Sequence, residues 1–302
     1  MKNHAESSLF NPQNLATVGR RAIKRIYHQF LLNGQQQKRL VFVVGCQRSG
    51  TTMLMSTFER DFQTKLYGET GLSPKNSRRL KPYAEIAQIV ARDKAPLIIA
   101  KPLVESQNIL KLLAYFPGSK AIWMYRGYKD VANSIIHRFS INTTIRNLRS
   151  IIGGEGGDAW FSEGVSEETR QIVAHFFAED MTPGEANTLL WYVRNILFFE
   201  LKLDHHPDVF LCKYEDIVAQ PGQMMRNIYQ FLGFNYPGDR IVSHIHTQSV
   251  SRGKSIDISP ELEALCAALL QKIEEVYTAR LAPAAPKVNQ PPNLLEKTQA
   301  LS

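Results

Sequence analysis

Residues 41–61, VFVVGCQRSGTTMLMSTFERD, constrain the fold more than any other stretch of this chain. An apolar run at 41–44 suits a buried strand, and a loop at 45–52 joins it to a helical pattern that begins near Thr51. Backbone N–H groups at a helix N-terminus lack intrahelical partners and lie at the positive end of the helix dipole. The order strand, glycine-containing loop, helix therefore predicts an anion site of the phosphate-binding kind.

The loop differs from the Walker A pattern G-x-x-x-x-G-K-[ST] at an informative position. Gly45 and Gly50 have the right spacing, but Thr51 stands where a lysine would reach the β- and γ-phosphates. The cation lies inside the loop instead, at Arg48, whose planar guanidinium suits a phosphate or sulfate oxyanion. The pattern indicates a nucleotide whose phosphate-linked group is not that of an ordinary NTP. The alternative is a strand-to-helix turn without a ligand.

Length and composition limit the number of domains and the kinds of partner that the sequence allows. A chain of 302 residues without a long linker predicts one large domain, and 44% hydrophobic with 21% charged residues is ordinary for a globular protein. The formal charge of +8 favours an anionic partner, namely a polyphosphorylated cofactor, an acidic substrate, nucleic acid or a membrane surface. Charge alone does not choose among these partners.

The three cysteines, Cys46, Cys212 and Cys266, are isolated, which argues against a disulfide framework or a zinc site. Cys46 in the loop is either a reactive thiol or a small residue that fits there. The sequence has no apolar run of membrane-spanning length, and its N-terminus lacks the apolar core of a signal peptide. We therefore expect a cytoplasmic protein.

Residues 1–38 form an N-terminal extension in front of the first strand. Apolar residues recur there at helical spacing with arginines and lysines between them, which predicts an amphipathic basic helix. The apolar positions are Leu15, Val18, Ala22, Ile26 and Phe30. Such a helix either packs on the domain with a solvated basic face or makes a weak peripheral contact with anionic lipid.

Short apolar runs alternate with amphipathic helical patterns through residues 39–282. Runs at 97–101, 120–126 and 209–214 read as further strands, and each is followed by a helical pattern. We expect an α/β fold with a central, mostly parallel sheet flanked by helices, the three-layer arrangement of P-loop proteins. Arg48, Lys101 and Arg126 fall at or just after strand ends, where ligands of parallel sheets bind. Glu69 lies in a turn-rich loop at 67–74, where a second strand end could face the same site.

Three other segments break the alternation. Residues 140–187, with GGEGGD at 153–158, read as a partly helical insertion over the active-site face, whose acidic residues either select the substrate or are only solvated. Residues 248–255 form a basic, glycine-containing loop of a type that can fold over a phosphate. The tail at 283–302, rich in Pro, Ala, Asn and Gln, is expected to be disordered.

These motifs together resemble the sulfotransferases that use 3′-phosphoadenosine 5′-phosphosulfate (PAPS). Four segments carry the resemblance: GCQRSGTT at 45–52, YRGYKDVANSIIHR at 125–138, KYEDIVAQPGQMMRNIYQFLGF at 213–234 and SVSRGKS at 249–255. The nearest pattern is that of the branch containing protein-tyrosine sulfotransferases and many bacterial enzymes, in which a Gly-Glu loop supplies the base. Gly68-Glu69 and Lys101 match that branch, whereas Leu103 stands where the small-molecule branch has histidine.

The resemblance implies roles for individual residues. The implied catalytic residues are Glu69, Lys101 and Arg48. The implied cofactor-binding residues are Arg48, Ser49, Gly50, Thr51, Thr52, Arg126, Ser134, Arg138, Tyr214, Ser251 and Lys254. Two of these keep an alternative, since Arg138 could face solvent and Tyr214 could be a core residue, and Glu105 is the reserve base if Glu69 is only a surface carboxylate. The cofactor would be PAPS, its product 3′,5′-adenosine bisphosphate (PAP), and no metal is expected.

The expected reaction is in-line sulfuryl transfer from PAPS to an acceptor hydroxyl, with Glu69 as general base and Arg48 and Lys101 stabilising the bridging oxygen. The acceptor is a carbohydrate, lipid, small molecule or peptide tyrosine, and nucleic acid is not expected as a partner. Two other classes stay open: a P-loop kinase or NTPase, for which the missing loop lysine is unfavourable, and a noncatalytic nucleotide-binding interaction protein. The sequence determines neither the acceptor nor the oligomeric state.

Overall fold

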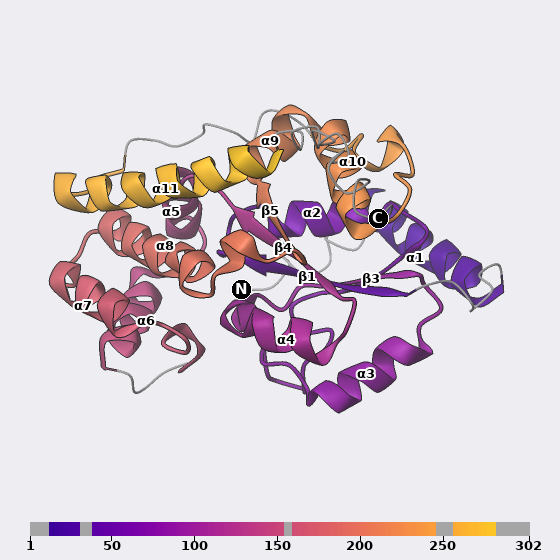
Figure 1. Cartoon of the computed structure of the whole chain (residues 1–302), viewed down its shortest axis with the longest axis horizontal. Helices are drawn as coiled ribbons and strands as arrows, with labels where there is room; N and C mark the ends of the chain where they lie inside the picture. The colour runs from indigo at the N-terminus through magenta and orange to yellow at the C-terminus, as the bar shows by residue number, and fades with distance from the viewer. Residues whose placement is uncertain (1–11, 31–37, 154–158, 246–255, 282–302) are drawn as a thin grey trace, which may run out of the picture.

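The computed structural model describes residues 12–30, 38–153, 159–245 and 256–281 (Figure 1). The strands are β1 (Arg39–Gly45), β2 (Thr64–Tyr67), β3 (Leu97–Ala100), β4 (Lys120–Tyr125) and β5 (Val209–Lys213). The α-helices are α1 (Pro12–Phe30), α2 (Thr51–Phe58), α3 (Tyr83–Arg92), α4 (Ile109–Tyr115), α5 (Tyr128–Ile136), α6 (Ile141–Gly153), α7 (Glu167–Phe176), α8 (Pro183–Glu200), α9 (Tyr214–Ala219), α10 (Pro221–Leu232) and α11 (Pro260–Leu281). Short 3₁₀ turns are η1 (Leu103–Asn108), η2 (Ala159–Phe161), η3 (Leu203–His205) and η4 (Asp239–Ile241).

The five strands form a parallel sheet in the order β2-β3-β1-β4-β5. The chain leaves β1, forms β2 and β3 on one side of it, and then crosses to β4 on the other side. This reversal makes the carboxyl end of β1 a topological switch point, the place where open parallel sheets bind ligands. All strand pairs in the described residues are parallel, which confirms the predicted α/β class.

Helices cover both faces of the sheet, giving three layers (Figure 1). In this view α3 and α4 lie below the sheet, α1, α2 and α10 lie above it, and α5 to α8 gather with α11 at the left. The strands are apolar on both faces because both are covered. Val41, Val43, Ile98, Ile122 and Trp123 are fully buried.

The amphipathic helix predicted in the N-terminal extension is present as α1, but three of its predicted apolar positions, Ala22, Ile26 and Phe30, are exposed. Ile26 and Phe30 are 58% and 72% exposed, so the expectation that they form the packing face is wrong. Lys24 is buried instead, with Nζ donating to Glu59 O (3.1 Å) and Thr64 Oγ1 (2.9 Å). Polar contacts decide the orientation because the facing surface offers carbonyl and hydroxyl acceptors at the end of α2.

The predicted insertion at 140–187 is helical where the structure describes it. It contains α6, η2, α7 and the start of α8, where Thr182 and Glu185 form a capping box. Leu148 and Val173 are fully buried, so this segment packs into the core through its helices. Every helix of the described ranges is too short or too polar to cross a bilayer.

Candidate active site

The loop between β1 and α2 packs so closely that two positions require glycine. Gly45 has a φ of +115°, and a Cβ there would lie 2.3 Å from Met124 O on β4. Gly50 has a φ of +87°, and a Cβ there would lie 2.2 Å from Cδ2 of Tyr214. Both the left-handed backbone and the lack of space exclude larger side chains. Ser106 braces the loop from η1, because its Oγ accepts a hydrogen bond from Gly45 N at 3.1 Å.

The start of α2 has the donors that a phosphate needs. Leu54 N donates to Gly50 O (3.1 Å), so the N–H groups of the first turn precede the helical hydrogen bonds and lie at the positive end of the dipole. The Oγ of Ser49 is buried and has no hydrogen-bond partner among the described residues. A buried hydroxyl without a partner is uncommon, and an anion oxygen above the loop would satisfy it. The loop therefore fits the 5′-phosphosulfate end of PAPS.

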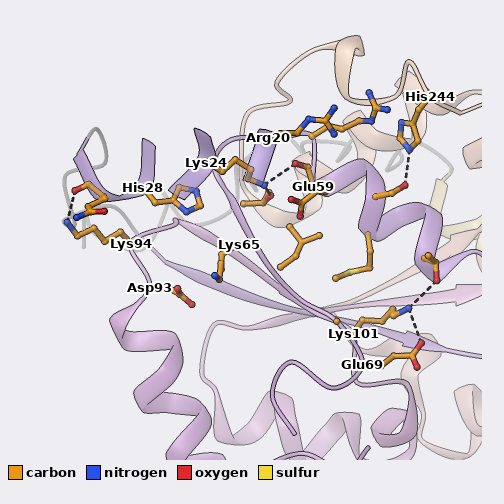
Figure 2. Close-up of a pocket in the computed structure, with 18 of the residues that line it drawn as sticks. Arg20, Lys24, His28, Glu59, Lys65, Glu69, Asp93, Lys94, Lys101 and His244 are labelled. Atoms are coloured by element: carbon orange, nitrogen blue, oxygen red, sulfur yellow. Dashed lines mark hydrogen bonds and ion pairs between the residues drawn. The ribbon is translucent and has the colours of Figure 1, made fainter. Parts of the chain in front are cut away.

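Glu69 and Lys101 come together beside this loop (Figure 2). Lys101 Nζ lies 3.0 Å from Glu69 Oε1 and donates to Thr52 Oγ1 at 3.1 Å. The parallel register places this lysine, since Lys101 N donates to Tyr67 O at 2.9 Å and so links the ends of β2 and β3. The Lys101 side chain is 10% exposed and that of Glu69 is 46% exposed. The Glu69 carboxylate is therefore accessible, whereas the lysine beside it is largely buried.

Glu105, the reserve base, lies in a buried polar network. It is 4% exposed, pairs with Arg79 Nε at 2.9 Å, and accepts hydrogen bonds from Leu80 N (3.2 Å) and Asn108 Nδ2 (2.9 Å). The same arginine and asparagine also contact Glu163, and hydrogen bonds from Arg79 and Asn108 lower the pKa of Glu163 to about 2 against the opposing effect of burial. These contacts give Glu105 a structural position that holds η1 against the loop before α3.

Glu105→Gln is expected to lower the free energy of unfolding by about 1–3 kcal/mol, because it leaves Arg79 without one of its charged partners. Turnover of the folded fraction should change less than about three-fold, because the carboxylate does not reach Glu69 or Lys101. Urea denaturation and steady-state kinetics of the purified variant measure both quantities. A hundred-fold loss of kcat with unchanged stability would assign the base to Glu105 instead.

The residues predicted to bind the 3′-phosphate lie where β4 meets α5. Arg126 Nη2 lies 3.1 Å from Asp130 Oδ2, and the guanidinium carbon lies 4.3 Å from the centroid of the Tyr214 ring. Arg48 Nε donates to Ser134 Oγ at 3.0 Å, which joins the phosphate loop to α5. Two contacts thus join residues predicted to bind the cofactor: Arg126 contacts Tyr214, and Arg48 contacts Ser134. Arg48 contacts Ser134, whereas Lys101 contacts Thr52 and Glu69.

Three predicted cofactor residues are not part of these contacts. Arg138 lies just after α5 with an exposed side chain, and Ser251 and Lys254 fall outside the described residues. Tyr214 is 6% exposed, and its ring packs against Arg126 and Gly50, so it is a buried residue of the site. Its contact with the cofactor stays a prediction.

Sequence reasoning missed several residues that support this site. Asp130 pairs with Arg126 four residues earlier, a spacing that on a helix signals an ion pair. Glu215 accepts a hydrogen bond from Gly127 N at 3.2 Å, and burial raises its pKa. Arg194 on α8 is fully buried, donates to Leu103 O at 3.4 Å, and has its pKa lowered to about 10 by burial. No local pattern marks Glu215 or Arg194, because their partners are distant in sequence.

In the described residues, the cysteines form no disulfide and the histidines belong to no metal-ligand cluster. Cys46, Cys212 and Cys266 are free and buried, and burial raises the pKa of the Cys46 thiol to about 11, so Cys46 fills space in the loop. In the described part of the chain, no three His, Cys, Asp or Glu side chains gather as metal ligands would.

Comparison with solved structures finds sulfotransferases of low identity. The sulfotransferase domain of the Synechococcus PCC 7002 olefin synthase is 17% identical with a TM-score of 0.48, covering 80% of this chain and 96% of its own. A sulfotransferase from Alicyclobacillus acidocaldarius is 12% identical (TM-score 0.46; 80% and 94% covered), and mouse sulfotransferase SULT7A1 complexed with PAP is 16% identical (TM-score 0.41; 79% and 85% covered). Structures this distant say nothing of substrate here, and no curated protein matches the chain.

The comparison with protein families is decisive. Residues 38–262 match the family model described as "Sulfotransferase domain". The matched range contains the phosphate loop, Glu69, Lys101 and the contacts around Arg126, and it takes in most of the chain. The chain therefore belongs to the sulfotransferase domain family and is a PAPS-dependent sulfotransferase.

Proposed function

We propose that this enzyme transfers the sulfuryl group to an acceptor hydroxyl in line, with Glu69 as the general base. One observation carries the proposal: Lys101 Nζ lies within hydrogen-bond distance of both Thr52 Oγ1 on the phosphate loop and Glu69 Oε1. A hydroxyl that contacts Glu69 would therefore lie next to the group held by the loop. PAPS, when bound, supplies the sulfuryl group and a phosphate leaving group.

Different residues of the chain would bind the two ends of the cofactor. Ser49, Gly50, Thr51 and Thr52 would hold the 5′-phosphosulfate end through the hydroxyls and N–H groups at the start of α2. Arg126 and Ser134, at the end of β4 and on α5, would hold the 3′-phosphate, with Arg138, two residues after the end of α5, as a further ligand. The Tyr214 ring would support Arg126 from below, as the 4.3 Å stacking contact indicates.

Charge stabilisation would come from cations in place of a metal. Lys101 lies at the end of β3 with a fixed direction, because Thr52 and Glu69 both contact its ammonium group. Arg48 projects from the loop toward α5 and is available to the leaving phosphate from that side. Glu69 would take the proton from the acceptor hydroxyl as the new S–O bond forms. Pre-placed charges of this kind need no reorganisation during the reaction.

Thermal denaturation with PAP, ADP and AMP tests the two-phosphate site. PAP at 100 times its Kd should stabilise the fold by about 2.7 kcal/mol, seen as a rise in Tm, whereas equal concentrations of ADP and AMP should give a clearly smaller rise. The Arg126→Ala variant should remove most of the preference for PAP over AMP. Equal stabilisation by ADP and PAP would contradict the 3′-phosphate site and favour a nucleoside-diphosphate or triphosphate enzyme.

Three further expectations stay predictions. They are the cytoplasmic location, the role of residues 140–187 in acceptor choice, and a weak contact of α1 with anionic membranes. For the last, α1 does expose Ile23, Ile26 and Phe30. Co-sedimentation with anionic phospholipid vesicles, comparing the parent chain with a variant carrying serine at these three positions, would test that contact.

A further inference from the structure

A large pocket opens beside Glu69 and Lys101 and extends away from the phosphate loop (Figure 2). Its volume is about 850 Å³, and it is lined by residues of α1, α2 and β2 and of the segments before and after β3. Thr52, Glu69 and Lys101 line one end of it, and Gln29 and Lys94 line another part. An acceptor whose hydroxyl reaches Glu69 would therefore place the rest of its structure in this pocket.

Helix α1 supplies one wall of the pocket. Arg20, Lys24, His28 and Gln29 line it, and two of them are anchored. Lys24 is fixed by Glu59 O and Thr64 Oγ1, and His28 Nε2 lies 2.7 Å from Phe62 O. The helix lies outside residues 38–262, the range that matches the family. This wall is thus a feature of the chain beyond the matched sulfotransferase domain.

The lining is strongly cationic. Seven lysine and arginine side chains face it against three carboxylates. The cations are Arg20, Lys24, Arg60, Lys65, Arg92, Lys94 and Lys101. None of the three carboxylates is free, since Glu69 pairs with Lys101, Asp93 accepts a hydrogen bond from Tyr67 OH at 2.5 Å, and Glu59 also has a partner. No ion pair joins Arg20 or Lys65 to a carboxylate of the described residues.

These cations repel one another in the absence of an anion. Burial is the main cause that lowers the pKa of Lys24 to about 8; Glu59 and Asp61 oppose this shift, and the charges of Arg20 and Lys65 contribute to it. Burial and Arg20 also lower the pKa of Arg60. Positive charges held together in a half-enclosed space favour a bound anion, because the anion relieves their repulsion and forms charge-assisted hydrogen bonds.

We propose that this pocket binds the acceptor and that the acceptor carries an anionic group, a carboxylate, sulfate or phosphate, in addition to the hydroxyl that reacts. The inference rests on the proposed function, since Glu69 defines the reacting end. Arg20 and Lys65 would bind the anionic group, and the hydroxyl would lie at Glu69. The described residues of 140–187 contribute nothing to this lining, so α1 rather than that segment forms the charged wall of the pocket.

The test compares two acceptor analogues that differ in one charge. They are 4-methylumbelliferyl β-D-glucoside, which is neutral, and the corresponding β-D-glucuronide, which is a carboxylate. Binding of each to the full chain is measured by calorimetry with saturating PAP, on the parent protein and on Arg20→Glu and Lys65→Glu. Lys111→Glu, an exposed lysine of α4 outside the pocket, is the matched charge-reversal control.

The glucuronide is expected to bind about 10- to 100-fold more tightly than the glucoside, and each pocket variant should remove about ten-fold or more of that preference. The control variant should keep the preference, and all variants should bind PAP as the parent does. Equal binding of the two glycosides, or failure of both to bind at millimolar concentration, would overturn the anionic-acceptor inference. The PAP measurement separates that result from failure of the proposed function, which would appear as loss of selective PAP binding in the parent protein.

Discussion

Glu69→Gln is expected to lower kcat by about 10²- to 10⁴-fold, the range that a positioned general base contributes. The amide has the shape of the carboxylate and still accepts a hydrogen bond from Lys101, so the loop geometry should survive. It cannot take the acceptor proton, and the loss should therefore appear in kcat. Rates of PAP release from PAPS with an acceptor, measured with binding of PAP to the same variant, check both parts.

A matched control is available on α3. Glu85 is an exposed glutamate whose carboxylate forms a 3.3 Å surface pair with Lys81, so Glu85→Gln should leave turnover within about two-fold of the parent. Near-full turnover of Glu69→Gln with intact PAP binding would show that Glu69 is only a surface carboxylate of its loop.

Lys101→Met is the second large effect, with an expected fall in kcat of about 10²- to 10³-fold, as for removal of one transition-state donor. Methionine keeps an apolar stem in a position where the side chain is 10% exposed, so folding should be retained. The ammonium also holds Glu69 in place, and the two residues should therefore act as a unit. We expect the double variant Glu69→Gln/Lys101→Met to lose much less than the product of the single losses.

The kinetics of the double-mutant cycle decide between coupled and separate roles. Lys111→Met is the control for loss of a lysine from the surface. If the fold-losses in kcat of the two single variants multiplied in full, Glu69 and Lys101 would act independently. The 3.0 Å ion pair would then be a structural contact with no joint role in the reaction. A normal kcat for Lys101→Met would show that Lys101 does not stabilise charge in the transition state.

The sequence predicted most of the fold because its strands are buried on both faces. Runs such as 41–44 and 121–125 are apolar throughout and lie next to helical patterns, which is the pattern of parallel βαβ units. Site residues directly after strands were predictable for the same reason, since parallel strands all end at one edge. Glu69 and Lys101, 32 residues apart in the chain, meet because β2 and β3 are neighbours in register.

What the sequence could not show depends on contacts distant in the chain. The apolar pattern of α1 suggested a helix that packs through Ile26 and Phe30, but packing is decided by Lys24 and His28, which find carbonyl oxygens at the end of α2. From the sequence alone Glu105 was a candidate base, but in the structure its carboxylate contacts Arg79 and Asn108. Sequence periodicity shows which residues share a face of a helix. It does not show which hydrogen-bond acceptors lie on the surface against which the helix packs.

The most direct measurement follows labelled sulfate from PAPS into an acceptor panel of a sugar, a lipid alcohol, a phenol and a tyrosine peptide, each in neutral and anionic form, with EDTA present. We expect label in at least one acceptor, one PAP formed per sulfated product, no dependence on added metal, and loss of the label with Glu69→Gln. Equal background label with the parent protein and Glu69→Gln across the whole panel, or PAP release without any sulfated product, would contradict the account.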